Sequence, residues 1–135
     1  MRKLKNRIRS NKEEKLIRIE KELLDFISNV AKNTYPNEFA AFLREDKDII
    51  SEIVLSPFSI FGRNSSTISN FSLPIDPTII GSVHSHPGRN GHPSESDLIF
   101  FSRYGKVHII VRYPFELEDY FFYSREGENL NYEVI

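Results

Sequence analysis

The sequence comprises 135 residues, of which 39% are hydrophobic and 27% are charged, as is typical of a soluble globular domain. It contains no cysteine, which excludes disulfide bonds, thiolate metal ligands and a cysteine nucleophile. No apolar stretch is long enough for a membrane span, and the N-terminus lacks the apolar core of a secretory signal. We therefore expect a cytoplasmic protein with no membrane partner.

The formal net charge is −1, but basic residues are concentrated at the N-terminus. Residues 1–10 contain five lysines and arginines and no acid, so residues 11–135 carry 13 basic and 19 acidic side chains. We interpret residues 1–10 as a basic, flexible arm and residues 11–135 as a single domain, because no repeat or linker interrupts them. The arm is also a candidate contact for nucleic acid, although the acidic remainder argues against binding along phosphates.

The spacing of apolar residues predicts the first long helix, over residues 11–33. These residues recur three or four positions apart, which is the pattern of one helix face. They are Leu16, Ile19, Leu23, Phe26, Ile27 and Val30. Pro36 lies just beyond the pattern and ends the helix.

Short runs of apolar, mostly β-branched and aromatic residues predict the strands. Two runs around a charged turn, 38–45 and 49–56, predict a β-hairpin. Further strands are expected at 65–74, 78–86, 106–113 and 117–124, with an edge strand at 131–135. A second helix is expected over 94–104, with Leu98, Phe100 and Phe101 facing inward. The expected fold class is α/β: a single mixed, mostly antiparallel sheet flanked by two main helices.

The stretch GSVHSHPGRNGHPSESD, residues 81–97, carries the candidate site. Because alternate side chains of a strand share one face, His84 and His86 present two imidazoles side by side. Asp97 is a sensible third ligand for zinc, which in catalytic sites keeps three protein ligands and one open position. Ser94 and Asp97 also match a helix capping box, which needs no metal. From the residues taken singly, both interpretations stay open.

The full pattern resembles the signature of the JAMM/MPN-plus metalloprotease family. His84-Ser85-His86-Pro87 is followed after ten intervening residues by Asp97, with Ser94 just before it, and Glu38 in YPNEFAAFL matches the family's upstream acid. The resemblance implies an MPN/JAB fold of cytidine-deaminase-like architecture. It also implies that His84, His86 and Asp97 bind one catalytic zinc ion, that Glu38 is the general base, and that Ser94 helps to stabilise the oxyanion.

The resemblance also implies a class of substrate. Eukaryotic members of the family cleave isopeptide bonds to ubiquitin and use two inserted segments to hold the linked modifiers. The stretches between Glu38 and His84 and after Asp97 are nearly filled by predicted strands, so this chain resembles the minimal prokaryotic members. For these, the implied substrate is a small ubiquitin-like or sulfur-carrier protein, cleaved after its C-terminal Gly-Gly. The alternatives are a non-catalytic MPN scaffold and a nucleic-acid-associated relative that uses the basic arm.

Two further histidines are expected outside the chemistry. His92 lies in the loop after the paired histidines, and we expect it to be exposed to solvent. His108 alternates with Val107 and Ile109 on a later strand, which predicts a packing or surface role.

Overall fold

The computed structural model describes residues 16–55 and 76–135. The predicted arm (1–10), the first positions of the predicted helix (11–15) and the predicted strand at 65–74 lie outside these ranges. Within them, seven strands form one sheet in the order β6-β5-β4-β2-β3-β1-β7. The strands are β1 (Ile17–Ile19), β2 (Ala40–Asp46), β3 (Ile49–Val54), β4 (Ile79–His86), β5 (Val107–Arg112), β6 (Tyr120–Tyr123) and β7 (Tyr132–Val134). The helices are α1 (Lys21–Thr34) and α3 (Glu95–Arg103), with a 3₁₀ turn at Leu117–Asp119.

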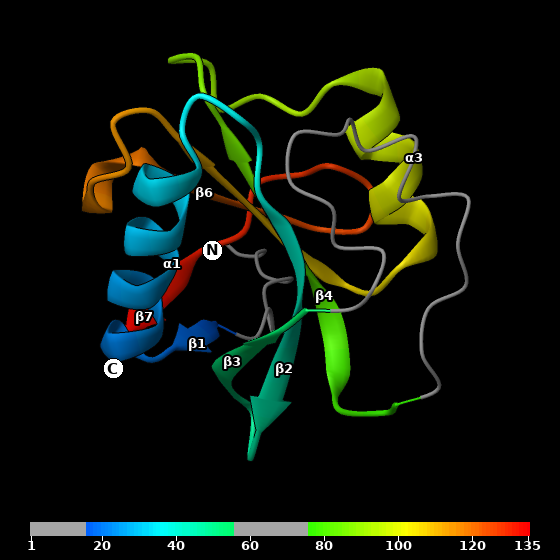
Figure 1. Ribbon diagram of the computed structural model, residues 1–135. Helices are drawn as coiled ribbons and strands as arrows, with labels where there is room; N and C mark the ends of the chain where they lie inside the picture. Colours follow the sequence, from blue (N-terminus) through cyan, green and yellow to red (C-terminus); the bar gives the residue numbers. More distant parts are fainter. Residues whose placement is uncertain (1–15, 56–75) are drawn as a thin grey trace, which may run out of the picture.

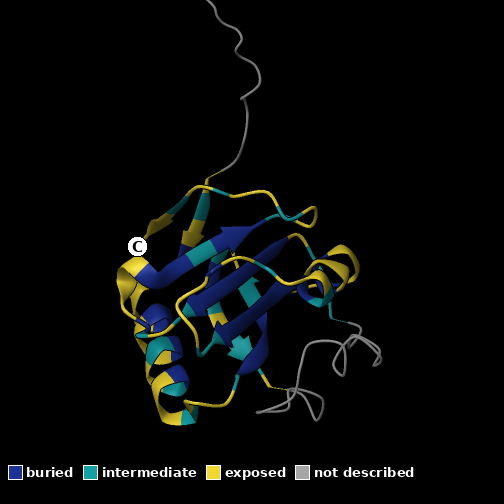
Figure 2. Ribbon diagram, turned by 90° about the horizontal axis from the view of Figure 1, so that it is seen from above, coloured by how far each residue is buried: buried dark blue, intermediate teal, exposed yellow. Residues whose placement is uncertain are grey.

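The two α-helices cover opposite faces of the sheet (Figure 1). Helix α1 packs into the larger core cluster, to which Ile27 and Val83 belong. Helix α3 packs into a second cluster, which includes Phe42 and Phe100. Figure 2 shows the central strands buried between the helices and the outer helix faces exposed. The predicted α/β class, with one mixed sheet between two main helices, is confirmed.

The strand pairings make the sheet more evenly mixed than expected. Among the six pairings in the described residues, β2–β3, β2–β4 and β5–β6 are antiparallel. The pairings β1–β3, β1–β7 and β4–β5 are parallel. Half of these strand pairings are therefore antiparallel, whereas we expected most of them to be. The predicted hairpin is confirmed as β2–β3, and its two turn residues, Lys47 and Asp48, have the positive φ angles of 53° and 67° that a two-residue hairpin turn requires.

Residues 17–19 form strand β1, which corrects the prediction of a continuous helix over 11–33. Ile17 and Ile19 pair with Tyr132 and Val134 of β7, and Ile19 also pairs with Ile50 of β3. The spacing of two between Ile17 and Ile19 is compatible with a strand, and the wider apolar pattern of residues 11–33 is compatible with a helix. Backbone pairing with distant strands therefore decides the conformation here, and local spacing does not.

The inner face of α1 also differs from the prediction. Leu23 and Ile27 are buried as expected, and Leu24 and Ala31 join them. Phe26, which we expected on this face, is 53% exposed. Once α1 begins at Lys21, the buried residues form a stripe at spacings of three and four that leaves Phe26 on its outer side.

The buried stripe of helix α3 differs from the prediction at Leu98. Phe100 and Phe101 are buried as expected, but Leu98 is 38% exposed, so its predicted inward orientation is wrong. The buried residues are Asp97, Phe100 and Phe101, at spacings of three and four from Asp97. The helix thus turns a carboxylate and two aromatic rings toward β4.

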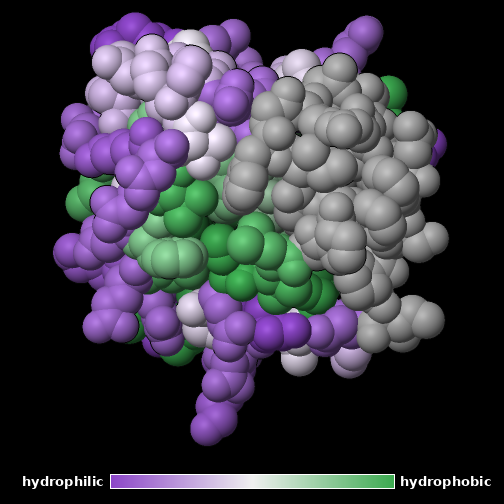
Figure 3. Space-filling model, in the orientation of Figure 1, coloured by the Kyte–Doolittle hydropathy of each residue, from purple (hydrophilic) through white to green (hydrophobic). Residues whose placement is uncertain are grey.

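Neither α-helix of the described residues has the length and apolarity needed to cross a membrane. On the face drawn in Figure 3, an apolar patch lies in the middle, and hydrophilic side chains border it on the left and below. This distribution agrees with helices that turn their apolar stripes toward the sheet.

The reassigned face of α1 can be tested by a pair of substitutions. Ile27→Ala should lower the free energy of unfolding by about 2–5 kcal/mol, because it leaves a cavity in the core. Phe26→Ala should change it by less than about 0.5 kcal/mol, because the side chain is exposed. Urea unfolding followed by circular dichroism measures both, and equal losses would contradict the observed face.

Candidate metal centre

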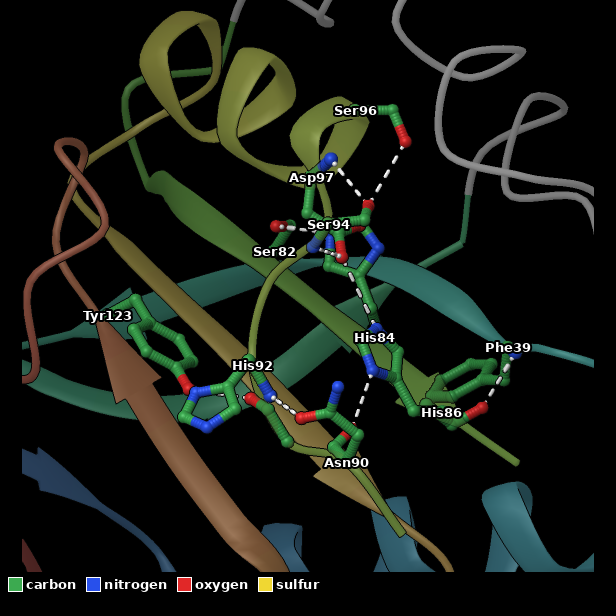
Figure 4. A network of polar contacts seen from close by, with 12 residues as sticks. Phe39, Ser82, His84, His86, Asn90, His92, Ser94, Ser96, Asp97 and Tyr123 are labelled. Atoms are coloured by element: carbon green, nitrogen blue, oxygen red, sulfur yellow. Dashed lines mark hydrogen bonds and ion pairs between the residues drawn. The ribbon is translucent and has the colours of Figure 1, made fainter. Parts of the chain in front are cut away.

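A small pocket at the carboxyl end of β4 brings together four of the five predicted site residues. Its volume is about 260 Å³, and its lining includes Glu38, His86, Ser94 and Asp97, together with residues of the 87–93 loop. Figure 4 shows His86, Ser94 and Asp97 around the ends of β4 and α3. A larger pocket of about 590 Å³ lies near the opposite end of β4, beside Ile80, but its lining contains no histidine. The candidate chemistry therefore belongs to the smaller pocket.

Strand pairing positions Glu38 beside His86. Ala40 of β2 pairs with His84 of β4 in an antiparallel register, so Glu38, two residues earlier, lies across from His86. Two hydrogen bonds secure this approach: the Ser85 amide donates to the Phe39 carbonyl at 2.8 Å, and the Phe39 amide donates to Ser85 Oγ at 2.8 Å. Burial raises the pKa of the Glu38 carboxyl, and nearby His86 partly offsets this rise.

Hydrogen bonds at both ring nitrogens orient His86. Its Nε2 lies 3.3 Å from Asp97 Oδ2, and its Nδ1 lies 3.0 Å from the Asn90 carbonyl oxygen, to which it donates. Burial alone lowers the pKa of His86, but the contacts with Asp97 and Asn90 outweigh burial and raise it. Likewise, burial alone raises the pKa of Asp97, but His86 and the Ser94 amide hold it below its usual range. This contact therefore favours the charged forms of both side chains.

Ser94 and Asp97 form the capping box that the sequence allowed. The Asp97 amide donates to Ser94 Oγ at 3.1 Å, and the Ser94 amide donates to Asp97 Oδ2 at 2.9 Å. Ser94 Oγ also lies 3.1 Å from Ser96 Oγ. Capping and metal binding are compatible, because the N-terminus of a helix favours a carboxylate.

His84 lies behind the pocket rather than in its lining. Its side chain is only 4% exposed, and its Nε2 lies 2.9 Å from Ser82 Oγ. Burial lowers the pKa of His84 to about 4, so the ring is neutral near pH 7. Within residues 16–55 and 76–135, as their side chains stand, no three His, Cys, Asp or Glu groups already converge as a complete metal site. Two candidate ligands, His86 and Asp97, are thus in contact, and the third, His84, is adjacent.

The donor set nevertheless fits a zinc ion. Two imidazole nitrogens and one carboxylate oxygen are ligands that zinc accepts. Two ligands of a tetrahedral zinc at about 2.0–2.1 Å are about 3.3–3.4 Å apart, and His86 Nε2 and Asp97 Oδ2 are 3.3 Å apart. The Nδ1 contact of His86 with a carbonyl is the second hydrogen bond that zinc-binding histidines commonly make.

The other two histidines lie as expected, but the network around one of them was not foreseen. His92 is exposed. His108 is fully buried in the sheet, where its Nδ1 lies 2.7 Å from Ser82 Oγ. Sequence reasoning missed Ser82, His108 and Asn90 as neighbours of the site. The alternation of Ser82, His84 and His86 on one strand face was the signal that pointed to Ser82.

The 87–93 loop is held against the sheet by several hydrogen bonds. Tyr123 Oη donates to the Gly91 carbonyl at 2.6 Å, and Arg112 Nη1 donates to the Arg89 carbonyl at 3.1 Å. Gly91 also lies against the ring of Phe121, so closely that a Cβ there would overlap it. Since the same loop supplies the Asn90 carbonyl to His86, the anchors of the loop also support a candidate ligand.

The fold and site together define an α/β protein with a His, His and Asp donor set and a nearby carboxylate. Residues 20–124 match the family model of prokaryotic homologs of the JAB domain. Since this match covers more than half of the chain, the chain belongs to that family, in agreement with its JAMM/MPN motif.

Individual relatives agree with this assignment. A probable metalloprotease from Haloferax volcanii is 30% identical over 130 residues, which cover 89% of this chain and 80% of the relative. A solved JAMM structure, described as a metalloprotease-like zinc site in the proteasome and signalosome, aligns with a TM-score of 0.72. It is 36% identical, over 90% of this chain and 99% of that chain. A JAB1/MPN domain protein from Archaeoglobus fulgidus aligns with a TM-score of 0.72 and 35% identity, over 89% and 98% of the two chains.

Two glycines of the loop offer a matched test of its anchoring. Gly91→Ala should lower the free energy of unfolding by about 1–3 kcal/mol, because the added methyl group overlaps the Phe121 ring. Gly88→Ala should leave stability nearly unchanged, because no atom lies within 4 Å of a Cβ at that position. Thermal and urea unfolding of both variants provide the measurement, and a stable Gly91→Ala protein would show that the loop is loosely held.

Proposed function

We propose that this protein is a zinc-dependent metallopeptidase that hydrolyses the peptide or isopeptide bond after the C-terminal Gly-Gly of a ubiquitin-like or sulfur-carrier protein. The observation that carries this proposal is the single pocket shared by Glu38, His86, Ser94 and Asp97, with His84 buried beside it. Family membership and the similarity to a probable metalloprotease support it.

In this proposal, His84, His86 and Asp97 hold the zinc ion. When bound, zinc supplies a Lewis acid that polarises the scissile carbonyl and makes water more acidic. The three side chains provide two neutral nitrogen donors and one negative oxygen donor, which leave one position open for chemistry.

Glu38 is the general base in this proposal. Its carboxylate takes a proton from the attacking water and delivers it to the leaving amine. Burial raises the pKa of Glu38, which makes the carboxylate a stronger base than an exposed one. Its place across from His86 puts it at the edge of the same pocket.

Ser94 stabilises the negative charge that develops on the scissile carbonyl oxygen. Its Oγ accepts a hydrogen bond from the Asp97 amide, which fixes the position of the oxygen. Ser96 Oγ, 3.1 Å away, can act as the donor in the contact between the two hydroxyl groups, so that in this proposal Ser94 donates its own proton to the carbonyl oxygen. A neutral donor fixed beside the reacting carbonyl is effective because it needs no reorganisation.

The size of the pocket supports a substrate without side chains at the cleaved position. At about 260 Å³, it lies below the usual range of about 300–1,000 Å³ for ligand pockets. Glycine is the residue that fits such a site with the least displacement. After Asp97, the chain is occupied by α3, β5, β6 and β7 with short connections, so this part has no long insertion for gripping a second modifier.

The role of Glu38 is tested by Glu38→Gln. The rate of cleavage of a Gly-Gly-linked conjugate should fall by roughly 10²–10⁴-fold, because the amide cannot accept the proton. Zinc content should remain near that of the wild type, because Glu38 is not a ligand. Ser102→Ala, at an exposed position of α3, is the control and should cleave normally.

Metal analysis separates the enzyme from the scaffold alternative. Protein purified gently should contain about one zinc ion per chain, and a chelator should abolish cleavage. Cleavage that persists in the presence of the chelator, or in the Glu38→Gln variant, would contradict the proposed mechanism. Absence of zinc binding by the wild type would favour the scaffold.

The Gly-Gly specificity is tested by conjugates that differ only at the cleaved junction. Replacing both glycines by alanines should lower kcat/KM by roughly 10–200-fold, the range expected for added methyl groups in a tight site. Quantitative gel analysis of both conjugates provides the measurement. Equal cleavage of the Ala-Ala conjugate, or of unrelated peptides, would refute the substrate assignment and leave the metallopeptidase assignment standing.

A further inference from the structure

A chain of buried polar side chains runs from His84 away from the pocket. His84 Nε2 lies 2.9 Å from Ser82 Oγ, and Ser82 Oγ lies 2.7 Å from His108 Nδ1. His108 Nε2 in turn lies 3.1 Å from the carbonyl oxygen of Gly105, just beyond α3. Ser82 and His108 are 0% exposed. The contact between Ser82 and His84 is drawn in Figure 4.

The carbonyl at the end of this chain determines where each proton lies. The Gly105 carbonyl only accepts, so His108 Nε2 carries the hydrogen that it donates. In a neutral imidazole the other nitrogen then accepts, so His108 Nδ1 accepts the hydroxyl hydrogen of Ser82. Ser82 has only one hydrogen, so its oxygen accepts the hydrogen of His84 Nε2. The free lone pair of His84 is therefore on Nδ1.

The reverse arrangement is disfavoured by the same carbonyl. If Ser82 donated to His84, the Nδ1 atom of His108 would carry a hydrogen and its Nε2 would present a lone pair to the Gly105 carbonyl. Two acceptors would then face each other 3.1 Å apart in a buried site, and both would be left without a hydrogen, which is unfavourable.

Aromatic side chains of α3 hold both rings in this orientation. The ring of Phe100 meets His84 edge to face, with centroids 5.1 Å apart. The ring of Phe101 stacks on His108 at 4.4 Å with an interplanar angle of 8°. The neutral tautomers and the ring planes are thus set by residues that do not line the pocket.

We infer that Ser82 and His108 are positioning residues, which hold His84 in its Nε2–H tautomer and make Nδ1 its ligand atom. This inference rests on the proposed zinc site. It gives His84 the support that the Asn90 carbonyl gives His86, but with the opposite nitrogen engaged. Hydrogen bonds of this kind to a ligand's second nitrogen typically contribute 10–100-fold to metal affinity.

The tautomers can be read directly in the wild-type protein. Long-range ¹H–¹⁵N correlation spectra of histidine-labelled, metal-free protein distinguish Nε2–H from Nδ1–H in each ring. We expect His84 and His108 as Nε2–H, and we expect zinc to shift the Nδ1 resonance of His84. His92→Gln removes the exposed ring and assists the assignment.

Variants then test whether the tautomer matters for the metal. Ser82→Ala should weaken zinc binding 10–100-fold in a competition titration with a chromophoric chelator. Ser82→Thr keeps the hydroxyl and should recover most of the loss. His108→Phe keeps an aromatic ring against Phe101 and should weaken binding to a similar extent. Ile109→Val, on the opposite face of β5, is the control for a mild core change and should bind zinc normally.

Each outcome has a distinct meaning. Nε2–H in the wild type, with loss in Ser82→Ala and recovery in Ser82→Thr, supports the inference. An Nδ1–H tautomer for His84, zinc bound through Nε2, or Ser82→Ala with affinity within twofold of wild type would overturn it while the proposed function stands. A wild-type protein that binds no zinc would overturn the proposed function together with the ligand role of His84.

Discussion

The contact between α3 and the buried end of β4 is the constraint on which the site depends. Asp97, Phe100 and Phe101 share one face of the helix, since they lie three and four residues apart. Asp97 meets His86 of β4, and the two phenylalanines pack beside His84 and His108. Large buried rings contribute much of the apolar area in a small core, so the packing that stabilises α3 also fixes the position of Asp97, the candidate ligand on this helix.

The second constraint is the register between β2 and β4. Residues that are 46 positions apart in the chain meet through the Phe39 amide and Ser85 Oγ, on the side of β4 away from the histidines. Because side chains alternate along a strand, this anchor on one face sets the place of Glu38 on the other. A shift of one residue in this register would move Glu38 to the opposite face of the sheet.

Burial divides the titratable groups of the site into distinct roles. It raises the pKa of Glu38 and lowers that of His84, whereas the pairing of His86 with Asp97 acts against burial in both partners. A carboxyl group with a raised pKa, a neutral ring, and a histidine and aspartate that favour each other's charged forms therefore lie close together. Groups whose environments separate their pKa values in this way are typical of catalytic sites.

The sequence by itself determined the features that depend on local spacing. The i, i+2 histidines on a strand, the cap at Ser94, the hairpin with its short charged turn and the choice of Phe100 and Phe101 as inward residues all follow from short-range geometry. The α/β class followed because the apolar residues of most segments repeated with the period of a strand or with the period of a helix, but not with both. The family motif added Glu38. No local sequence pattern shows that Glu38 lies close to His86.

Only the tertiary structure decided the features that depend on distant partners. Ile17 and Ile19 form a strand because β7, at the other end of the chain, pairs with them. Leu98 is exposed because the docking of α3 selects a different side of the helix. The orientation of the His84 ring depends on Ser82 and on His108, which lies 26 residues beyond Ser82. A buried hydrogen bond requires both partners at the correct distance, and that distance exists only once the strands have paired.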